Sequence, residues 1–260
     1  MKTEGKTEKI SFRNTIDFAS TTYATFGLYR YPAKFIPPVI AYILKNYGKS
    51  GMKVFDPFAG YGTVGVVSKI YGHDYEMWDL NPMLKVLHSI AIMKPTKVVV
   101  KDILQQMFSY KKEFVPNWQR LNYWFPEEVL LFLYKIWGYY HSLSDNSLKL
   151  LLTIPLLKTT RYFSYDDTQR QKLSKSQKSQ KKVFSLLSDD WKKRFFQMLE
   201  QEIGRVIKGI REYQALSPQN TKRIIRAGID AMEENLKQER DILITSPPYA
   251  IAGVYSTGKA

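Results

Sequence analysis

The residues whose types and spacing could do chemistry lie in two short motifs. The first is the turn Asp56-Pro57-Phe58-Ala59-Gly60-Tyr61-Gly62-Thr63. Its glycines let the backbone pass close to a ligand, because they lack a Cβ and accept dihedral angles that other residues avoid. Gly62 is not followed by Lys-Ser or Lys-Thr, which disfavours ATP. Gly65 fits the spacing of a dinucleotide fingerprint, but Asp56 would repel a pyrophosphate and favours a ligand with a cationic amino group.

The second motif is Ser246-Pro247-Pro248-Tyr249, which follows an apolar run over residues 241–244. The Ser246 side chain and the rigid carbonyl of Pro247 could accept hydrogen bonds from an exocyclic amine, which makes its nitrogen lone pair more nucleophilic. Tyr249 offers a ring against which an extruded base could stack. The alternative is a stiff surface turn, but such a turn would not explain why a strand of buried type ends there.

Acidic residues follow three of the apolar runs that predict strands. Asp56 ends the first run, and Asp79 ends the second, where it could accept hydrogen bonds from ribose hydroxyls. Asp230 follows the third and could hold an adenine amino group. Any one of them alone is more commonly a helix cap or a turn residue. Three at successive strand ends predict a ligand site along one edge of a sheet.

The elements that must position these residues are short strands separated by helices. We expect strands at 52–55, 75–78, 223–226 and 241–244, and helices at 37–46, at 64–71 and from residue 81 onward. A strand, a glycine turn, a helix, a second strand and an acidic residue, in that order, predict half of an open, mostly parallel α/β sheet.

Residues 93–220 interrupt this pattern with an aromatic-rich stretch of helical periodicity. We expect a helical insertion between the second and third strands, a core formed by residues 29–92 and 221–260, and a polar arm over residues 1–28. Between residues 158 and 194, eleven basic residues accompany four acidic ones. That segment is either a solvated loop, the commoner fate of such runs, or a segment that contacts the phosphates of DNA.

Composition narrows the class of protein. The 260 residues include 39 Lys and Arg against 24 Asp and Glu, a net charge of +15, so the expected partner is a polyanion, with nucleic acid first. Cysteine is absent, which excludes disulfides and thiolate metal sites, and three scattered histidines do not predict a metal site. No apolar run has the length of a bilayer span, and no signal-peptide pattern opens the sequence. We therefore expect a cytoplasmic protein without a metal ion or membrane contact.

Together, the two motifs resemble those of the amino-group DNA methyltransferases of restriction–modification systems. Thr-Ser-Pro-Pro-Tyr at 245–249 is the form typical of cytosine-N4 enzymes, whereas adenine-N6 enzymes usually have Asp or Asn in place of Ser246. Residues 29–37 also resemble the stretch that precedes the glycine turn in many of these enzymes. The resemblance covers about residues 20–92 and 221–250. It implies a Rossmann-like methyltransferase core that uses S-adenosylmethionine and acts on a cytosine flipped out of double-stranded DNA.

The resemblance also implies a role for each matching residue. In the methyl transfer, the residues would be Ser246, Pro247, Pro248 and Tyr249. In binding S-adenosylmethionine, they would be Lys34, Phe35, Asp56, Pro57, Phe58, Gly60, Gly62, Thr63, Asp79 and Asp230. Asp79 would take the ribose and Asp230 the adenine, while the glycine turn would hold the methionine part.

Two departures from the family pattern leave alternatives open. The insertion lies between the second and third strands rather than after the Ser-Pro-Pro-Tyr strand, and eleven residues follow Tyr249 where the family's sheet normally continues with at least three more strands. The core is therefore expected to be incomplete at its C-terminal end. We expect either a second polypeptide that completes the catalytic sheet, or an inactive product that only binds DNA or cofactor. Adenine-N6 methylation of DNA and guanine-N2 methylation of RNA are the alternative reactions.

Overall fold

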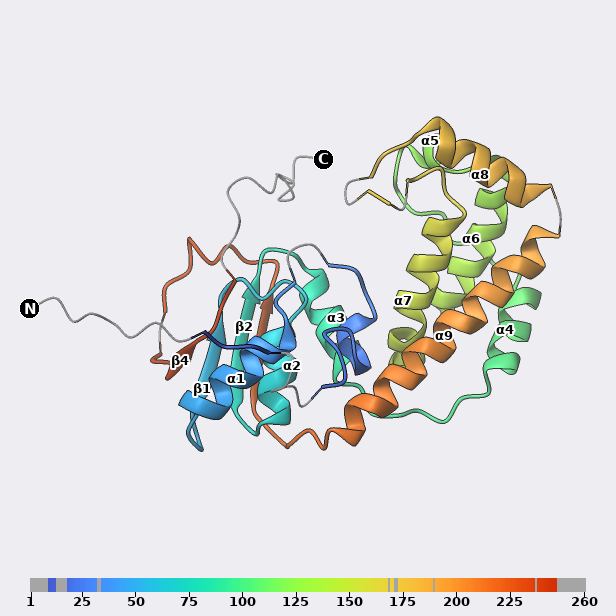
Figure 1. The fold of residues 1–260 in the computed structure, drawn as a ribbon. Coiled ribbons are helices and arrows are strands. Elements are labelled where there is room, and N and C mark those ends of the chain that lie inside the picture. Colours follow the sequence, from blue (N-terminus) through green and yellow to red (C-terminus); the bar gives the residue numbers. More distant parts are fainter. Residues whose placement is uncertain are drawn as a thin grey trace, which may run out of the picture.

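The structure, a computed structural model, describes residues 9–12, 18–31, 34–167, 169–170, 173–188, 190–236 and 238–246. An α/β core and a group of helices lie side by side (Figure 1). The core is built on a four-stranded sheet whose strands are β1 (Lys53–Asp56), β2 (Asp74–Asp79), β3 (Arg223–Ala227) and β4 (Ile242–Leu243). All pairings are parallel, in the order β3-β2-β1-β4. The predicted parallel α/β fold is thus confirmed, as is the helical insertion between its second and third strands.

The strand order places a ligand-binding edge beside β1. The chain moves from β1 to β2 on one side and returns to β4 on the other side of β1. Connections that leave in opposite directions open a crevice at the carboxyl ends of the two strands, the switch point at which open α/β sheets bind ligands. In this register Phe55 is paired with Leu243, so the residues just after β1 and β4 meet at that crevice.

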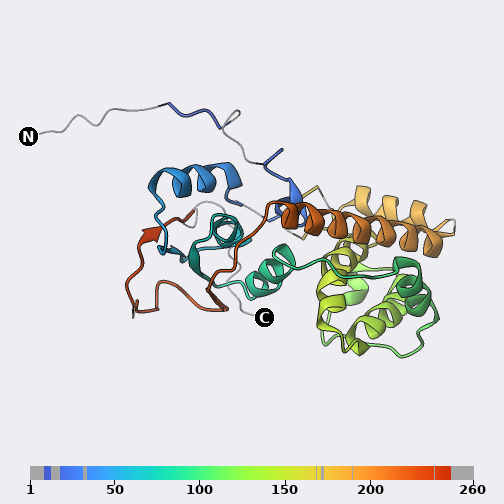
Figure 2. The ribbon, with the colours of Figure 1, turned by 90° about the horizontal axis from the view of Figure 1, so that it is seen from below.

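The two faces of the sheet differ in their cover. One face, with Val54 and Met77, packs against helices α1 (Pro37–Tyr47), α2 (Thr63–Ile70) and α3 (Met83–Ala91), all three close to their predicted positions. Pro37 begins α1, where its fixed φ suits the first turn of a helix. The opposite face, with Phe55 and Trp78, lies against the chain between β3 and β4. Figure 2 shows α1 and this connection on opposite sides of the strands.

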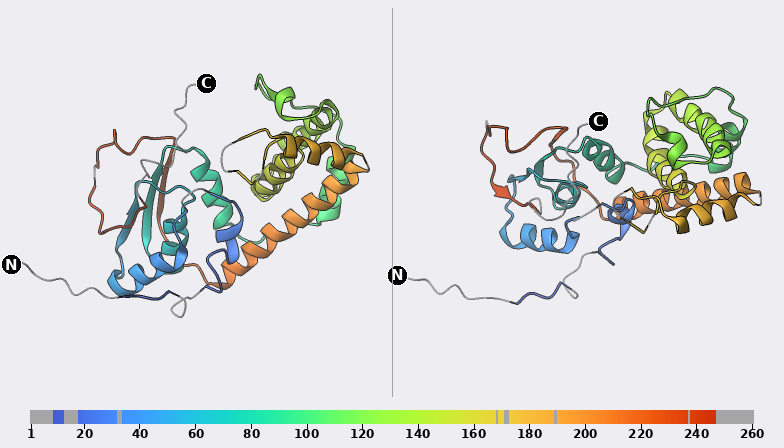
Figure 3. Two further views of the ribbon diagram at one scale, coloured as in Figure 1. Left: turned by 45° about the horizontal axis from the view of Figure 1, so that its top comes forward. Right: turned by 90° about the horizontal axis from the view of Figure 1, so that it is seen from above.

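The insertion consists of helices that share an apolar core of their own. They are α4 (Val100–Ser109), α5 (Leu121–Trp124), α6 (Glu127–Ser142), α7 (Asn146–Tyr162), α8 (Gln177–Leu187) and α9 (Trp191–Ala215). Aromatic rings fill the centre, among them Phe163 and Phe195, which are fully buried. Figure 3 shows the group as a separate body that is joined to the sheet layer by the long helix α9.

Helix α9 connects the two bodies. Its 25 residues extend about 37 Å at the usual rise per residue. Phe195 near its start packs in the helical group, and Tyr213 near its end packs under the sheet. Val206 and Ile210, between them, belong to a third cluster that also contains residues of α3 and α7. Three apolar clusters therefore follow one another along α9 from one body to the other.

The N-terminal segment corrects one expectation. A polar arm was predicted for residues 1–28, but Phe18 and Phe26 are buried in the core, and residues Ala24–Gly27 form the short 3-10 helix η1. The prediction is therefore wrong for residues 18–28. They pack closely against α9: a Cβ added at Gly209 would lie only 2.8 Å from the carbonyl oxygen of Ala24. A contact so distant in sequence leaves no local signal.

The described residues lack two features. No helix among them is long and apolar enough to cross a membrane. Likewise, the described part of the chain holds no group of three or more His, Cys, Asp or Glu side chains placed to bind a metal ion.

Candidate functional site

The glycine turn after β1 adopts a backbone that requires glycine. Gly60 and Gly62 have φ values of +53° and +84°, in the left-handed region that residues with a Cβ rarely enter. A Cβ on Gly60 would lie 2.9 Å from Cε1 of Tyr31, and one on Gly62 would lie 3.2 Å from Cδ1 of Leu84. Gly62 is also the N-cap of α2, so the turn leads directly into the amino end of a helix. Backbone N–H groups at such an end attract the carboxylate or phosphate of a ligand.

Asp79 joins the end of β2 to this turn. One of its carboxylate oxygens accepts a hydrogen bond of 2.6 Å from the Gly60 N–H, and the other accepts one of 2.7 Å from the Asn81 N–H. Asp79 therefore holds the two loops at the carboxyl edge of the sheet. Each oxygen keeps a second lone pair, and the side chain is only half-buried, so a ribose hydroxyl can still reach it.

Asp56 lies at the switch point itself. The side chain is 2% exposed, and its Oδ1 accepts hydrogen bonds from the Phe58 N–H at 3.1 Å and from Thr245 Oγ1 at 2.8 Å. Burial and, to a smaller extent, repulsion from Asp79 raise the pKa of Asp56 to about 7, against the effect of these two hydrogen bonds. Two carboxylates that repel each other are both stabilised in their ionised form by a cationic ligand.

The hydrogen bond from Thr245 joins the two predicted motifs. Thr245 and Asp56 are 189 residues apart in sequence, and their contact brings the start of the Ser-Pro-Pro-Tyr motif against the end of β1. Ser246 follows directly and is half-buried. The remaining predicted catalytic residues, Pro247, Pro248 and Tyr249, lie outside the described residues. The structure therefore brings Asp56, Asp79 and the beginning of the second motif to one edge.

Other predicted cofactor residues lie around this edge in different ways. Lys34 donates a hydrogen bond to the carbonyl of Phe26 and lies 4.9 Å from the centre of the Tyr61 ring, so it supports the glycine turn from behind. Phe35 packs against the core below. The Thr63 side chain is 2% exposed, which leaves its backbone as the part that a ligand can meet.

Asp230 lies on the exposed loop after β3. Its Oδ1 accepts a hydrogen bond of 2.9 Å from the Met232 N–H, which makes it a turn residue in this structure. Close by, a cavity of about 650 Å³ opens on the less covered face of the sheet. Pro57 and Phe58, both predicted to bind cofactor, contribute to its wall. The other lining residues are Phe55, Trp78, Ala231, Met232, Glu234, Leu236, Gln238, Glu239, Arg240 and Leu243.

Sequence reasoning missed two supporting residues. Thr245 received no role, although a hydroxyl directly after a buried strand is a signal for a hydrogen bond at a strand end. His88 lies fully buried beneath Gly62, and its Nε2 is 2.9 Å from the hydroxyl of Tyr75. Burial, with the positive charges of Arg223 and Lys69, lowers the pKa of His88 to about 3, so the ring is neutral. Nothing in the local sequence around His88 marks it as a support of the turn.

These features define a class of protein. A parallel sheet with a glycine turn after its first strand, an acidic residue at the end of its second and a switch point beside the first strand form a Rossmann-like α/β core. The core is consistent with those of S-adenosylmethionine-dependent methyltransferases, and its paired carboxylates suit the cationic groups of that cofactor.

Comparison with known proteins points to the same class. The chain is 24% identical over 267 aligned residues to the type II methyltransferase M.MvaI of Kocuria varians, a match that covers 95% of the chain and 57% of that protein. It is 30% identical over 117 residues to the type II methyltransferase M.MjaII of Methanocaldococcus jannaschii, covering 42% of the chain and 22% of that protein. The chain thus spans little more than half of the first relative. No protein-family model matches the sequence, and no solved structure matches it significantly.

Proposed function

We propose that this protein methylates DNA, transferring the methyl group of S-adenosylmethionine to the exocyclic N4 amino group of a cytosine. The observation that supports the proposal is the hydrogen bond from Thr245, directly before the candidate amine-binding motif, to Asp56 of the candidate cofactor turn. The similarity to two type II methyltransferases and the net charge of +15 support DNA as the substrate. The protein would act in the cytoplasm as the modification enzyme of a restriction–modification system.

Each group at the switch point has a task in this reaction. The cofactor supplies an electrophilic methyl group on a sulfonium. Ionised Asp56 and Asp79 would attract its positive charge and the ribose hydroxyls, and the α2 amino end would receive its carboxylate. Ser246 Oγ and the Pro247 carbonyl would accept hydrogen bonds from the cytosine amine, and the Tyr249 ring would stack on the base after it leaves the duplex. As the nitrogen–carbon bond forms and the carbon–sulfur bond breaks, the amine becomes acidic and loses a proton to water.

The direct test is methyl transfer from labelled S-adenosylmethionine to duplex DNA and, in a parallel reaction, to RNA, followed by nucleoside analysis of each product. We expect N4-methylcytosine. N6-methyladenine would overturn the choice of base, and methylation of RNA at guanine N2 would overturn the choice of substrate. Cofactor and DNA binding without any product would show a binding protein.

Ser246→Ala tests the site assignment. The loss of one acceptor aimed at the reacting amine is expected to lower the turnover number on the order of 100-fold, while affinity for the cofactor stays the same. Ser89→Ala, which removes an exposed hydroxyl on α3 that bonds only within its own helix, is the matched control. Equal turnover in both variants would remove Ser246 from the catalytic site.

We further propose that a second polypeptide completes the sheet beyond β4. Two observations support this. Leu243 and Met232 on the less covered face are 63% and 81% exposed, and among the described strands only β1 pairs with β4. Exposed apolar faces and open strand edges are uncommon in folded monomeric proteins.

Co-expression with the product of the adjacent reading frame should give a stable complex that binds less of a hydrophobic dye than this chain does. The proposal would be contradicted if the co-expressed protein bound as much dye as this chain alone while the Leu243→Lys variant bound less.

A further inference from the structure

The segment from residue 161 to residue 187 concentrates positive charge on the helical group. We call this segment, which comprises the end of α7, a loop and α8, the basic loop–helix unit. It holds seven Lys and Arg residues and two acidic ones. What the unit presents to solvent depends on which of these charges are neutralised inside it.

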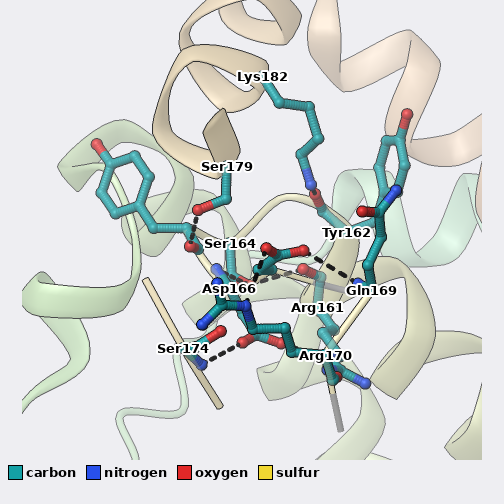
Figure 4. Close-up of polar contacts among 11 residues, drawn as sticks. Arg161, Tyr162, Ser164, Asp166, Gln169, Arg170, Ser174, Ser179 and Lys182 are labelled. Carbon is teal, nitrogen blue, oxygen red and sulfur yellow. Dashed lines mark hydrogen bonds and ion pairs between the residues drawn. The ribbon is translucent and has the colours of Figure 1, made fainter. Parts of the chain in front are cut away.

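Both acidic residues of the unit are used internally. Asp166 is 1% exposed; its Oδ2 accepts a hydrogen bond of 2.6 Å from Nε of Arg161, and its Oδ1 accepts one of 2.8 Å from the Ser174 N–H. Figure 4 shows both contacts converging on the Asp166 carboxylate. Asp167 accepts a hydrogen bond from the Gln169 N–H and pairs with Arg170 at 3.6 Å. Both carboxylates therefore have partners within the unit, and neither pairs with Lys178 or Lys181.

The inner side of α8 is fastened to this loop. Ser179 Oγ donates a hydrogen bond of 2.5 Å to the carbonyl of Tyr165, and Nζ of Lys182 donates one of 2.7 Å to the carbonyl of Tyr162. Lys175, just before the helix, lies between two rings, 4.5 Å from the centre of Tyr123 and 4.4 Å from that of Tyr165. The position of α8 is thus set by contacts that use its buried side.

The outer side of α8 carries lysines that the described residues leave unpaired. Lys178 and Lys181 are exposed and lie one helical turn apart, and neither makes a hydrogen bond or ion pair with any described residue. Phe184, 60% exposed, follows one turn further along. A helix that presents two free ammonium groups is preorganised in its backbone to bind phosphates, because only side-chain order must be created on binding.

The unit lies at the same end of the molecule as the candidate site. In Figures 1 and 3, α8 and the loop before it occupy the end of the helical group toward which the carboxyl ends of β1 and β2 also point. We propose that the basic loop–helix unit binds the phosphate backbone of duplex DNA next to the modified base, with Lys178 and Lys181 as phosphate ligands and Asp166 as the positioning residue. This inference rests on the proposed function only for where the DNA lies. The binding of phosphates by the two lysines does not depend on it.

The test compares two double charge reversals of equal size. Lys178→Glu/Lys181→Glu changes the outer side of α8. Lys94→Glu/Lys97→Glu changes two exposed lysines with the same spacing in the connection between α3 and α4, at the opposite end of the molecule (Figure 1). Binding of fluorescent duplex DNA without cofactor is measured by anisotropy over a series of KCl concentrations, with circular dichroism as the check of folding.

We expect the α8 variant to bind at least tenfold more weakly and to lower the salt slope by about 1.8, because each phosphate contact contributes about 0.9. The control should keep the slope of the parent protein. Equal losses in both variants would show a response to net charge alone and would overturn the proposal. If the α8 variant loses DNA binding but the parent protein methylates nothing, this inference holds and the proposed function fails. If the parent protein methylates DNA but the α8 variant binds DNA unchanged, the proposed function holds and this inference fails.

Asp166→Asn separates organisation from charge. The substitution makes the protein more positive, so net charge alone predicts tighter binding to DNA. The positioning role predicts weaker binding and a smaller salt slope, because Arg161 loses its charged partner and the loop before α8 loosens. Tighter binding in a folded Asp166→Asn protein would remove Asp166 from the proposal.

Discussion

Asp56 shows how a single carboxyl group can be prepared for a cationic ligand. It is buried at the end of β1, and repulsion from Asp79 adds to the cost of ionising it. A cation placed between the two carboxylates would reverse that balance, since the ionised form would then have a partner. Binding and ionisation are therefore linked, and the affinity for the cofactor should depend on pH.

The pH dependence gives the first prediction. The pKa of Asp56 is raised to about 7 in the free protein and is expected to fall when the cation binds. Affinity should therefore increase by about tenfold per pH unit from about pH 5 to 7 and level off above it, while the cofactor's own amine, with a pKa near 7.7–8.0, stays charged below pH 7. Isothermal titration calorimetry with S-adenosylmethionine in the absence of DNA measures it. Asp56→Asn should bind weakly with a flat profile, and a parent profile that is equally flat would exclude this role.

Thr245 provides a second prediction about the same carboxylate. Thr245→Val keeps the size of the side chain but removes the hydroxyl that donates to Asp56 at 2.8 Å. Because that hydrogen bond favours the ionised form, its loss should move the midpoint of the affinity profile above pH 7. Thr221→Val is the control, since the hydroxyl of Thr221 is buried, has no hydrogen-bond partner among the described residues, and should leave the midpoint in place when it is removed. An identical midpoint in both variants would contradict the prediction.

Among the elements, α9 offers a pair of glycines in opposite situations. A Cβ on Gly204 would meet no atom within 4 Å, whereas one on Gly209 would lie 2.8 Å from the carbonyl oxygen of Ala24 in η1. Gly204→Ala should stabilise the protein by about 1 kcal/mol, which is the difference in helix propensity. Gly209→Ala should destabilise it by about 1–3 kcal/mol, because η1 must move away from the helix. Urea unfolding of the two variants measures both, and changes of the same sign would show that η1 does not pack on α9.

Which elements could be predicted depends on how local their causes are. The strands and the glycine turn follow from short apolar runs and from residues such as Gly60 that permit only certain backbones, so their predicted positions agree with the structure. The burial of Phe26 depends on α9, where Glu212 accepts a hydrogen bond from the Ala24 N–H across 188 residues. No local pattern encodes such a contact, and a polar arm was predicted in its place.

The same distinction holds for the candidate site. Asp56 and Asp79 could be placed at one edge from their positions after two strands, because parallel strands end at the same edge. Two hydrogen bonds of the site could not be predicted in this way, because they depend on the register of strands distant in sequence. They are the bond from the Gly60 N–H to Asp79 and the bond from Thr245 to Asp56. The roles predicted for residues 247–249 stay predictions, because these residues lie outside the described part of the chain.

On the scale of the whole molecule, Tyr61 links the glycine turn to the helical group. It lies between Gly60 and Gly62, is 1% exposed, and donates a hydrogen bond of 2.5 Å to the carbonyl of Thr25. Its ring belongs to the apolar cluster that joins the two bodies, with residues of α7 and α9 such as Ile154 and Ile210. A ligand that stabilises the turn therefore stabilises a side chain on which the helical group packs.

This linkage predicts that cofactor binding protects distant helices. At a concentration 100 times its Kd, S-adenosylmethionine should add about 2.7 kcal/mol to the free energy of unfolding. Because Tyr61 packs with residues of both α7 and α9, the most protected amides of these helices should slow their exchange by about the same factor as those of α2. Hydrogen exchange with mass spectrometry measures this by peptide, and α5, which has no residue in the joining cluster, is the internal comparison. Protection confined to the α/β core would show that the two bodies open independently and that Tyr61 transmits no stability between them.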